Sequence, residues 1–557
     1  MRNIVIVVAS LFLLMACDRD LLNQLPEYGP SDESFYTNES ELKMAITGVY
    51  NTLYTNTEYD VNLLMVLDCA ADVGWYRMAG GNIQHIGNGS HDSQTGIFKT
   101  YWGNFYAAIA RCNILLEKMP NAMSAVDPKE YNRIESEARF FRAFYYWHLS
   151  ELFGDVPLIK QSQTLEDCKV PRDKKEQVVE FMIKELQECV AGLPVEPSTD
   201  GRISQGAAWA LLSRIALYNQ QWQLSIDAAQ QVMNGSKYKL HSSYPDLFNY
   251  AQKGNKEFIF YITGLTDFRM TNQETAFASR LVGGSAIYVP TQSLVDSYEC
   301  TDGLSIDKSP LFNPMRPYEN RDPRLGYVVA LPGSDYFGYQ FETHRDSVEC
   351  WDYSVTPAKR IPNTEATHAY ASFSGYNFRK WTDPKDKNML WKCTIQFCLI
   401  RYAEVLLNYA EAKIEANQID NSVYDAINQI RQRATVNMPP LRKGLTQAEL
   451  RNALRRERKY ELAMEGFRLF DIRRWKIAEK VMPGTLYGRV KDKGTPGVLL
   501  NAPVIDELAT PDYKAVINKD QMFIIEQRNF NPGRDYLWPI PRIEMDTNDK
   551  LEQNPGY

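Results

Sequence analysis

The chain has 557 residues, of which 44% are hydrophobic, and it carries a formal net charge of −7 at neutral pH. A chain of this length can bury a large core, and its acidic balance argues against a general nucleic-acid-binding protein, which normally presents a basic face. Nine cysteines are too few in so long a chain for a disulfide scaffold. A pairing of Cys393 with Cys398 stays open at this stage.

The first residues indicate a lipoprotein signal peptide. Arg2 precedes an apolar run of about 12 residues, short of the roughly 20 that a membrane-spanning helix needs, and the run ends in LMAC at 14–17. We therefore predict that residues 1–16 are removed, that Cys17 carries lipid, and that residues 17–30 form a tether. The alternative is an ordinary secretory signal in which Cys17 is incidental.

Helical periodicity dominates the first part of the chain, from residue 31 to residue 240. Apolar residues recur at spacings of three and four over 41–53 and 98–119, and the aromatic-rich stretch 134–153 continues this pattern. Gly154 is expected to end this last helix, and Pro157 prevents the helix from resuming.

Two stretches have the pattern of helix pairs of the tetratricopeptide type. In the first, Ser204 can cap a helix that carries several small residues, and a second helix follows over 222–233. In the second, helices are expected over 401–416 and 423–434. Small residues where helices cross let such hairpins pack closely, so the pattern predicts a solenoid.

The C-terminal part, 241–557, begins with a region of different character that extends to about residue 400. Gly and Pro become frequent, and short apolar runs at 258–261 and 327–330 predict brief strands between long loops. Loops of this length inside a compact domain are usually functional. We therefore predict a mostly α fold, in which tetratricopeptide-like helix pairs form a solenoid scaffold that a loop-rich, partly β region decorates.

The sequence carries no motif for a metal, a cofactor or nucleophilic catalysis. The six histidines are scattered without an H-E-x-x-H pattern, and no G-x-S-x-G elbow, P-loop or dinucleotide fingerprint occurs. His148 lies in an aromatic helical stretch and is interpreted as a packing residue. The sequence thus predicts neither a metal site nor a cofactor.

One charged segment, 457–475, has the residue types of a catalytic site. Glu457, Glu461 and Glu465 recur every fourth residue, which would place three carboxylates on one helical face beside several arginines. Glycosidases use a pair of carboxylates, but a structural ion-pair network produces the same pattern. We favour the ion-pair network.

Several segments together resemble the SusD/RagB family of surface nutrient-binding lipoproteins. They are the lipidation site, EARFFRAFYY at 137–146, LFGDVPL at 152–158, the charged segment 457–475, LWPIP at 537–541 and NPGY at 554–557. The resemblance covers nearly the whole chain. It implies a helical fold with tetratricopeptide pairs, a SusC-like TonB-dependent transporter as partner, and binding of a glycan or another nutrient without catalysis. It also implies that these segments serve the fold and the transporter contact.

A glycan-binding face needs exposed aromatic rings for the C–H patches of a sugar and polar side chains for its hydroxyls. The first choice is the glycine-flanked stretch of Trp75 and Tyr76, with Asp72 and Asn82 as polar partners. In members of the family that resemble this chain, the loop after the second helix commonly contributes to the ligand site. The alternative for each of these rings is that it is packed in the hydrophobic core. Further candidate rings come from the middle of the chain: Tyr288, Tyr336, Phe337, Tyr339, Trp351 and Tyr353.

The favoured function is a glycan-binding lipoprotein without enzymatic activity, anchored by lipid in the outer membrane and facing the cell exterior. It would deliver its ligand to the SusC-like transporter. The alternatives are a lipid-anchored glycoside hydrolase, which would need a carboxylate pair in a cleft, and a binder of another nutrient such as peptide.

Overall fold

The computed structural model describes residues 35–57, 60–196 and 201–557. The predicted signal peptide, the predicted lipidation site Cys17 and the predicted tether 17–30 lie outside these residues. None of the helices in the described ranges combines the length and the apolar composition that crossing a membrane requires.

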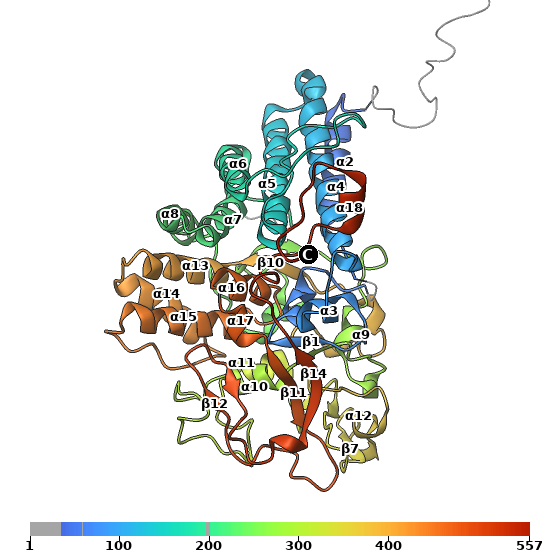
Figure 1. The fold of residues 1–557 in the computed structure, drawn as a ribbon, viewed down its shortest axis with the longest axis vertical. Helices are drawn as coiled ribbons and strands as arrows, with labels where there is room; N and C mark the ends of the chain where they lie inside the picture. The colour runs from blue at the N-terminus through green and yellow to red at the C-terminus, as the bar shows by residue number, and fades with distance from the viewer. Residues whose placement is uncertain (1–34, 58–59, 197–200) are drawn as a thin grey trace, which may run out of the picture.

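Long helices stack side by side through the upper and middle parts of the molecule (Figure 1). Helix α2 (Glu39–Tyr50) packs on α4 (Gly96–Lys118) and on α5 (Pro128–Phe153). The stack continues through α6 (Lys175–Cys189), α7 (Gln205–Tyr218), α8 (Trp222–Met233), α13 (Tyr402–Glu415), α14 (Asn421–Arg431) and α15 (Gln447–Glu461). Because α8 packs directly on α13, the segment between them is an insertion into one continuous helical array.

Helix α5 shows how local sequence sets the ends of an element. Asp127 precedes the helix and its carboxylate accepts hydrogen bonds from the backbone N–H groups of Lys129 (2.9 Å) and Glu130 (3.3 Å). Pro128 is the first helical residue, where a missing N–H costs nothing. Gly154, with φ of 78°, ends the helix as predicted. The helix begins before the predicted residue 134, because this cap lies upstream of the apolar stripe.

Both predicted tetratricopeptide-like pairs are confirmed. Helices α7 and α8 form the first pair, helices α13 and α14 the second. Ala208, Ala229, Ala410 and Ala426 lie on these four helices and are almost completely buried, as expected for small residues in closely packed helix pairs. Ser204 occupies the cap position of α7, but its hydroxyl contacts the hydroxyl of Tyr238 (2.7 Å) and not the helix, so the predicted side-chain cap is wrong.

The inserted segment leaves and re-enters the helical array through one pair of strands. Strand β2 (Phe258–Ile262), predicted at 258–261, pairs antiparallel with β10 (Phe397–Arg401). The strand predicted at 327–330 is only partly correct. Residues Arg324–Val328 form helix α11, and only Val329–Ala330 form strand β4, which pairs with β9 (Asn377–Phe378).

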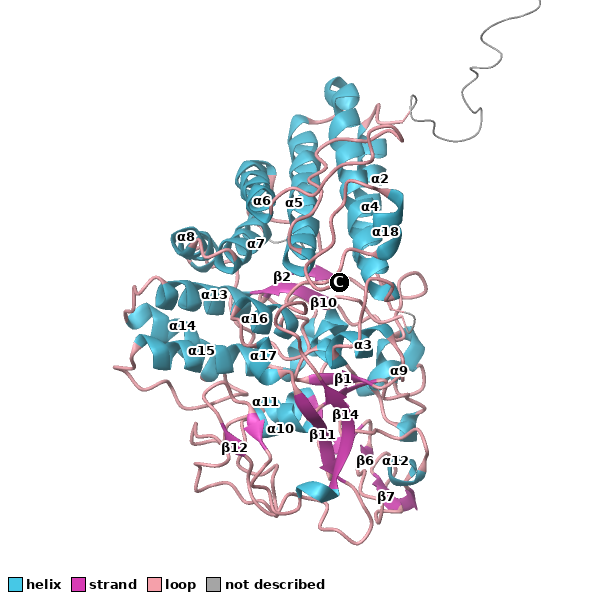
Figure 2. Cartoon of the chain, viewed as in Figure 1, coloured by secondary structure: helices cyan, strands magenta, loops and turns pink. Residues whose placement is uncertain are grey.

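Small sheets and short helices fill the lower half of the molecule (Figure 2). The other pairs are β1 (Gly74–Tyr76) with β3 (Tyr288–Pro290), β11 (Gly484–Val490) with β14 (Met522–Arg528), and β12 (Val504–Ile505) with β13 (Pro511–Asp512). One sheet has four strands in the order β5 (Asp335–Tyr336), β6 (Tyr339–Gln340), β7 (Glu349–Asp352) and β8 (Lys359–Pro362). The short helices are α3 (Asn82–Asn88), α9 (Gln273–Phe277), α10 (Gln292–Ser297), α12 (Thr364–Thr367), α16 (Arg468–Arg474), α17 (Ala478–Val481) and α18 (Arg542–Thr547).

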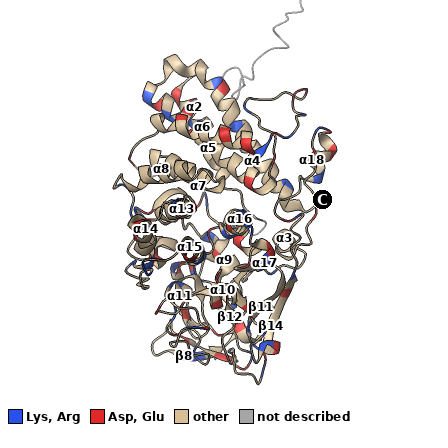
Figure 3. Cartoon of the chain, turned by 60° about the vertical axis from the view of Figure 1, so that its left-hand side comes forward, with Lys and Arg blue, Asp and Glu red and all other residues tan. Residues whose placement is uncertain are grey.

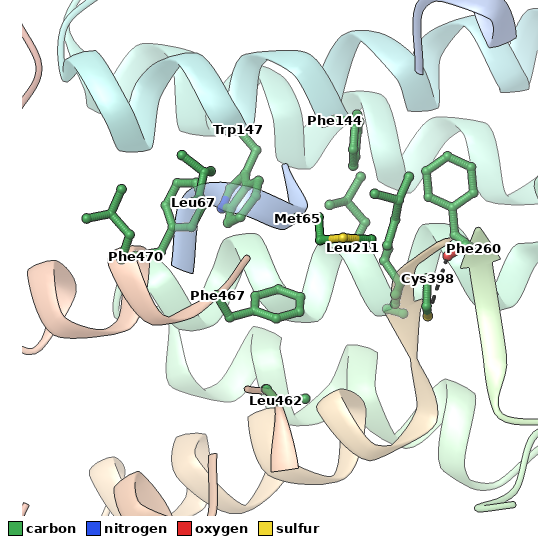
Figure 4. Close-up of a cluster of buried hydrophobic side chains, with 14 of the residues drawn as sticks. Met65, Leu67, Phe144, Trp147, Leu211, Phe260, Cys398, Leu462, Phe467 and Phe470 are labelled. Atoms are coloured by element: carbon green, nitrogen blue, oxygen red, sulfur yellow. Dashed lines mark hydrogen bonds between the residues drawn. The ribbon is translucent and has the colours of Figure 1, made fainter. Parts of the chain in front are cut away.

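Aromatic side chains join α5 to segments that are distant in the sequence. Trp147 and Phe144 of α5 point toward rings from distant parts of the chain (Figure 4). The rings of Trp147 and Phe470 lie 4.9 Å apart, and those of Phe144 and Phe260 lie 5.6 Å apart. His148 is buried beside them; its burial lowers its pKa to about 3, and its Nδ1 lies 2.9 Å from the carbonyl oxygen of Phe144. The prediction that His148 is a packing residue is confirmed.

All eight cysteines within the described ranges are free thiols. Cys393 pairs through its backbone with Thr271, whereas Cys398 lies in β10 with its thiol facing the carbonyl oxygen of Phe260 (3.9 Å). The disulfide between Cys393 and Cys398 that the sequence left open is therefore not formed.

Candidate functional site

The stretch that the sequence singled out for ligand binding is a strand, not a loop. Strand β1 pairs antiparallel with β3, and this register sets Trp75 opposite Val289 and Tyr76 opposite Tyr288. Successive side chains of a strand point to opposite faces of the sheet. Trp75 and Tyr76 therefore lie on different sides of β1.

Tyr76 and Tyr288 form the floor of a pocket. Their rings lie 5.2 Å apart with an interplanar angle of 34°, and the hydroxyl of Tyr288 donates to Thr57 Oγ1 (3.2 Å). The cavity above them measures about 250 Å³, near the lower end of the roughly 300–1,000 Å³ of small-molecule sites. We name it the β1 pocket; its lining residues are Asn56, Thr57, Leu63, Tyr76, Asn82, Ile83, Ile97, Thr100 and Tyr288.

Glycines bring α3 against the pocket floor. Gly80 has φ of 72°, a left-handed conformation that favours glycine. A Cβ atom on Gly81 would lie only 2.0 Å from Cε1 of Tyr76, so the backbone packs directly on the ring. Asn82 follows as the first residue of α3 and is exposed at the pocket. This arrangement places an amide that can donate and accept hydrogen bonds beside an aromatic floor.

Trp75 lies on the other face, in a small core with Ala286, Val289 and Leu486. It is 5% exposed, its ring packs edge-on against Phe373, and its indole Nε1 donates to a carboxylate oxygen of Glu526 (3.4 Å). The expectation that Trp75 is exposed on a loop is wrong. Pairing with β3 turns the glycine-flanked stretch into a strand whose outer face β11 and β14 cover.

Asp72 is occupied by structural ion pairs. Arg468 donates to both of its carboxylate oxygens (2.7 and 2.9 Å), and Nζ of Lys459 lies 3.2 Å away. Burial favours the neutral acid, but the two cations outweigh it and hold the pKa of Asp72 well below its ordinary value. The buried carboxylate is not presented to a sugar, which corrects the expectation from the sequence.

The candidate rings in the middle of the chain divide into buried and exposed groups. Tyr288 of the pocket floor is 0% exposed and its partner Tyr76 is 2% exposed, while Tyr336 and Phe337 are buried with Phe341 and Leu390. All four candidate rings were expected to be exposed, and the structure corrects this. The expected exposure is confirmed for Trp351 (38%) and Tyr353 (42%), at β7 and just after it. Tyr339 is half-buried, with Nζ of Lys387 lying 3.9 Å from its ring centre.

The charged segment 457–475 is interrupted, and most of its side chains are buried. Basic and acidic residues lie close together along α15 and α16 (Figure 3). Helix α15 ends at Glu461, and Met464 and Gly466 adopt left-handed conformations before α16 begins. A Cβ on Gly466 would lie 2.0 Å from the carbonyl oxygen of Leu64. Glu465 therefore lies in a turn, and the expectation of three carboxylates on one helical face is wrong.

Ion pairs nevertheless join all three carboxylates, as the favoured interpretation predicted. We name the cluster the charged core; it consists of Glu257, Arg324, Lys380, Arg401, Arg431, Arg433, Glu457, Glu461 and Glu465, none more than 5% exposed.

Glu461 is the centre of the charged core. Its Oε1 accepts hydrogen bonds from Arg401 (2.7 Å) and Arg433 (2.8 Å), and its Oε2 accepts one from Arg324 (3.1 Å). Burial raises the pKa of Glu461, but the three guanidinium groups outweigh burial and lower it to about 2. An acid so firmly ionised and so fully paired supports the fold and has no free oxygen for proton transfer.

Six of the nine pocket residues escaped the sequence analysis, and three of these are polar: Asn56, Thr57 and Thr100. Thr100 lies on the exposed side of α4, and the two others follow the short turn after α2. They are small polar residues without any motif, so only the fold brings them together with Tyr76.

Comparisons with known proteins identify the family. A model of the SusD family matches residues 256–557, and a family model described as starch-binding and associating with the outer membrane matches residues 29–217. The chain therefore belongs to the SusD family.

Individual relatives span most of the chain. A SusD-like protein of Formosa agariphila is 26% identical over 509 residues, covering 87% of this chain and 92% of that protein. The crystal structure of a SusD-like carbohydrate binding protein from Bacteroides fragilis has 29% sequence identity and a TM-score of 0.80, covering 93% of this chain and 100% of the other. The starch-binding protein SusD of Bacteroides thetaiotaomicron is 30% identical over 149 residues, 25% of each chain.

Proposed function

We propose that this protein is a lipid-anchored glycan-binding protein of the cell surface. It captures oligosaccharide without cleaving it and passes it to a SusC-like TonB-dependent transporter in the outer membrane. Membership of the SusD family and the similarity to a SusD-like carbohydrate binding protein support the glycan as ligand. The predicted signal peptide, residues 1–16, which ends directly before Cys17, supports the anchor.

The β1 pocket is the site that we assign to the sugar. The observation that carries this assignment is the meeting of two tilted tyrosine rings, whose edges line the cavity, with a rim of amide and hydroxyl side chains, Asn56, Asn82 and Thr100. Rings pack against the apolar faces of a sugar, and amides and hydroxyls exchange hydrogen bonds with its hydroxyls. The small volume suits a single sugar unit or a chain end, with the remainder of a glycan outside the pocket.

The state of the acidic residues supports binding over hydrolysis. A glycosidase needs two carboxylates that flank the scissile bond, one of them able to donate a proton. The sequence offered Glu457, Glu461 and Glu465 for these roles, and all three are buried in ion pairs with arginine or lysine. These carboxylates serve the fold.

Blocking the pocket from its rim tests the assignment. Thr100 is exposed on α4 and lines the pocket, so Thr100→Trp fills the opening without disturbing a core. Its neighbour Lys99 is exposed on the same helix but does not line the pocket, and Lys99→Trp is the matched control. We expect Thr100→Trp to weaken binding of the cognate oligosaccharide at least about 30-fold, or ~2 kcal/mol, and Lys99→Trp to leave it unchanged.

Calorimetry against a panel of oligosaccharides and peptides first identifies the ligand, and an assay for new reducing ends runs in parallel. Equal affinity in the two tryptophan variants would remove the β1 pocket from the site. Release of new reducing ends by the wild type would show that the protein is a hydrolase and not a binding protein. A response to peptides alone would show that the ligand is a peptide and not a glycan.

The anchor has a separate test. Cys17→Ala should release the protein into the soluble fraction of cells that lack the transporter, because lipid is the only hydrophobic anchor proposed. Retention in the membrane fraction would contradict the lipoprotein assignment and leave the binding experiment unaffected.

A further inference from the structure

A second cluster of reactive side chains lies apart from the β1 pocket and the charged core. It joins Glu274, on helix α9, to Asp386 and Cys393, which lie at the two ends of an irregular segment. One ligand atom from each of the three residues lies within 4.8 Å of the others. An antiparallel bridge between Thr271 and Cys393 holds the two segments together.

Glu274 has an unsatisfied oxygen inside this cluster. Its side chain is completely buried. Oε1 accepts a hydrogen bond from the backbone N–H of Asp383 (2.5 Å), whereas Oε2 meets no donor group and the Glu274 carboxyl lies next to that of Asp386. A buried polar atom without a partner is uncommon and calls for an explanation, which here comes from the two other ligand groups beside it. The neighbouring carboxylate of Asp386 adds a second reason for a bound proton or cation, because two carboxylates repel each other unless one of these lies between them.

Asp386 is held in place by a partner outside the cluster. The hydroxyl of Tyr250 donates to Asp386 Oδ2 (2.5 Å) and accepts a hydrogen bond from the backbone N–H of Thr394 (3.0 Å). Metal-ligating carboxylates normally have such hydrogen bonds from an outer shell, which fix their orientation. Asp386 is also half-buried, so the cluster has a route to solvent.

We propose that Glu274, Asp386 and Cys393 bind a divalent transition-metal ion, of which Zn²⁺ fits best. Two carboxylate oxygens and a thiolate sulfur belong to the ligand set of zinc, which usually takes four ligands, and the fourth position is open to water beside Asp386. Ca²⁺ does not fit, because it takes oxygen ligands only and would leave the thiol unused. Binding releases the thiol proton of Cys393 and any proton shared by the carboxyl groups.

The metal would fasten an exposed loop to the body of the protein. Between Asp386 and Cys393 the chain exposes Met389 (48%) and Trp391 (59%), two large apolar side chains on the surface. A cation that ties both ends of this segment to α9 fixes the position of the two side chains. The site is thus a clip for the loop, independent of the β1 pocket.

Cobalt is the probe, because Co²⁺ replaces Zn²⁺ at such sites and a thiolate ligand gives a charge-transfer band in the near ultraviolet. We expect the chelator-treated full chain to bind one equivalent of Co²⁺ with this band, and Zn²⁺ to displace it. Cys393→Ser should abolish the band, and Asp386→Asn should weaken metal binding at least about 10-fold.

Two buried residues of the same types serve as matched controls. Cys398→Ser removes a buried free thiol only five residues from Cys393, outside the cluster. Glu365 repeats the environment of Glu274, since its Oε1 accepts from the backbone N–H of Arg280 and its Oε2 has no hydrogen-bond partner, but it belongs to no such cluster among the described residues. Cys398→Ser and Glu365→Gln should retain the band and the affinity.

Trypsin digestion of the wild-type protein provides a second readout, which needs neither cobalt nor a substituted protein. Lys385 and Lys392 are exposed at the ends of the loop, and Zn²⁺ should slow cleavage there in the wild type. Absence of stoichiometric metal binding, a band that persists in Cys393→Ser, or a cleavage rate that Zn²⁺ does not change would each overturn the proposal.

Discussion

The charged core and the β1 pocket lie in one chain and use their polar groups in opposite ways. In the charged core, the carboxylates of Glu457, Glu461 and Glu465 are paired with cations that the chain itself supplies. In the pocket, Asn82 and Thr100 stand at the surface around an aromatic floor. A dense group of charged residues therefore does not by itself indicate a functional site. The informative property is whether polar groups are satisfied within the chain or face solvent.

The same contrast occurs within three residues of strand β1. Trp75 faces a closed core and donates its N–H to Glu526, whereas Tyr76, although only 2% exposed, lines the cavity. The two residues looked equivalent in the sequence, because the alternation of a strand becomes meaningful only once its pairing partner is known. Substitutions in the two regions should consequently separate effects on stability from effects on binding.

Glu461→Gln should have the largest effect. The substitution leaves Arg324, Arg401 and Arg433 with an uncompensated buried charge, and breaking a buried pair in this way costs about 3–5 kcal/mol. Urea denaturation measures the loss of unfolding free energy. Asp425→Asn, an exposed acid on α14, is the control and should change stability by less than about 0.5 kcal/mol. An unchanged stability combined with lost glycan binding would move the functional site into the charged core.

Trp75→Ala should also act on the fold. Removing a buried tryptophan from a packed core costs about 3–5 kcal/mol, because the cavity that remains collapses only in part. Thermal unfolding followed by circular dichroism gives the loss, and Thr100→Ala at the pocket rim is the comparison expected to stay near the wild type. A fully stable Trp75→Ala variant with weakened sugar binding would show that the two faces of β1 have been assigned the wrong way round.

Acid should weaken the charged core before it affects the pocket. The pKa of Glu461 is about 2 in the folded protein and 4.5 is its ordinary value, so its contribution is complete above pH 4.5 and disappears as the pH falls through 2. This difference corresponds to a contribution on the order of 3 kcal/mol. The difference in unfolding free energy between the wild type and Glu461→Gln should therefore become smaller as the pH is lowered from neutral to about pH 3. A gap that stays constant over this range would contradict the low pKa of Glu461.

Much of the helical scaffold follows from local signals. Helix α8 was predicted with its observed bounds, and Gly154 ends α5 as expected, because apolar periodicity and helix stops are encoded within a few residues. The failures concern contacts between distant segments. No local pattern predicts that Tyr288 pairs with Tyr76, or that the backbone of Leu64 lies against Gly466 in the turn that separates Glu465 from the helix.

The candidate site was accordingly predictable only in part. Tyr76, Asn82 and Tyr288 were named from the sequence and do line one pocket, but for the wrong reason, since they were expected on exposed loops. The cluster of Glu274, Asp386 and Cys393 could not be found at all, because its spacing matches no metal-binding motif.

Trp351→Ala should have the smallest effect and would sharpen the boundary of the binding surface. Trp351 lies on the outer face of β7, where Cys350 and Asp352 point inward, and the guanidinium of Arg360 lies 5.3 Å from the centre of its ring. An exposed cation–π contact contributes about 0.5–1 kcal/mol, so the free energy of unfolding should fall by no more than that.

The informative result is the dependence on ligand length. If a polysaccharide extends from the β1 pocket across exposed rings, Trp351→Ala should weaken its binding about threefold to tenfold, or ~0.7–1.4 kcal/mol, while a short oligosaccharide that only fills the pocket should bind as before. Affinity electrophoresis against the polysaccharide and calorimetry with the oligosaccharide compare the two. Phe268→Ala removes an exposed ring from another loop and controls for the loss of surface area. No effect on either ligand would confine recognition to the pocket, and identical effects on both would place the binding site elsewhere. Only a surface that continues beyond the pocket distinguishes a long glycan from a short one.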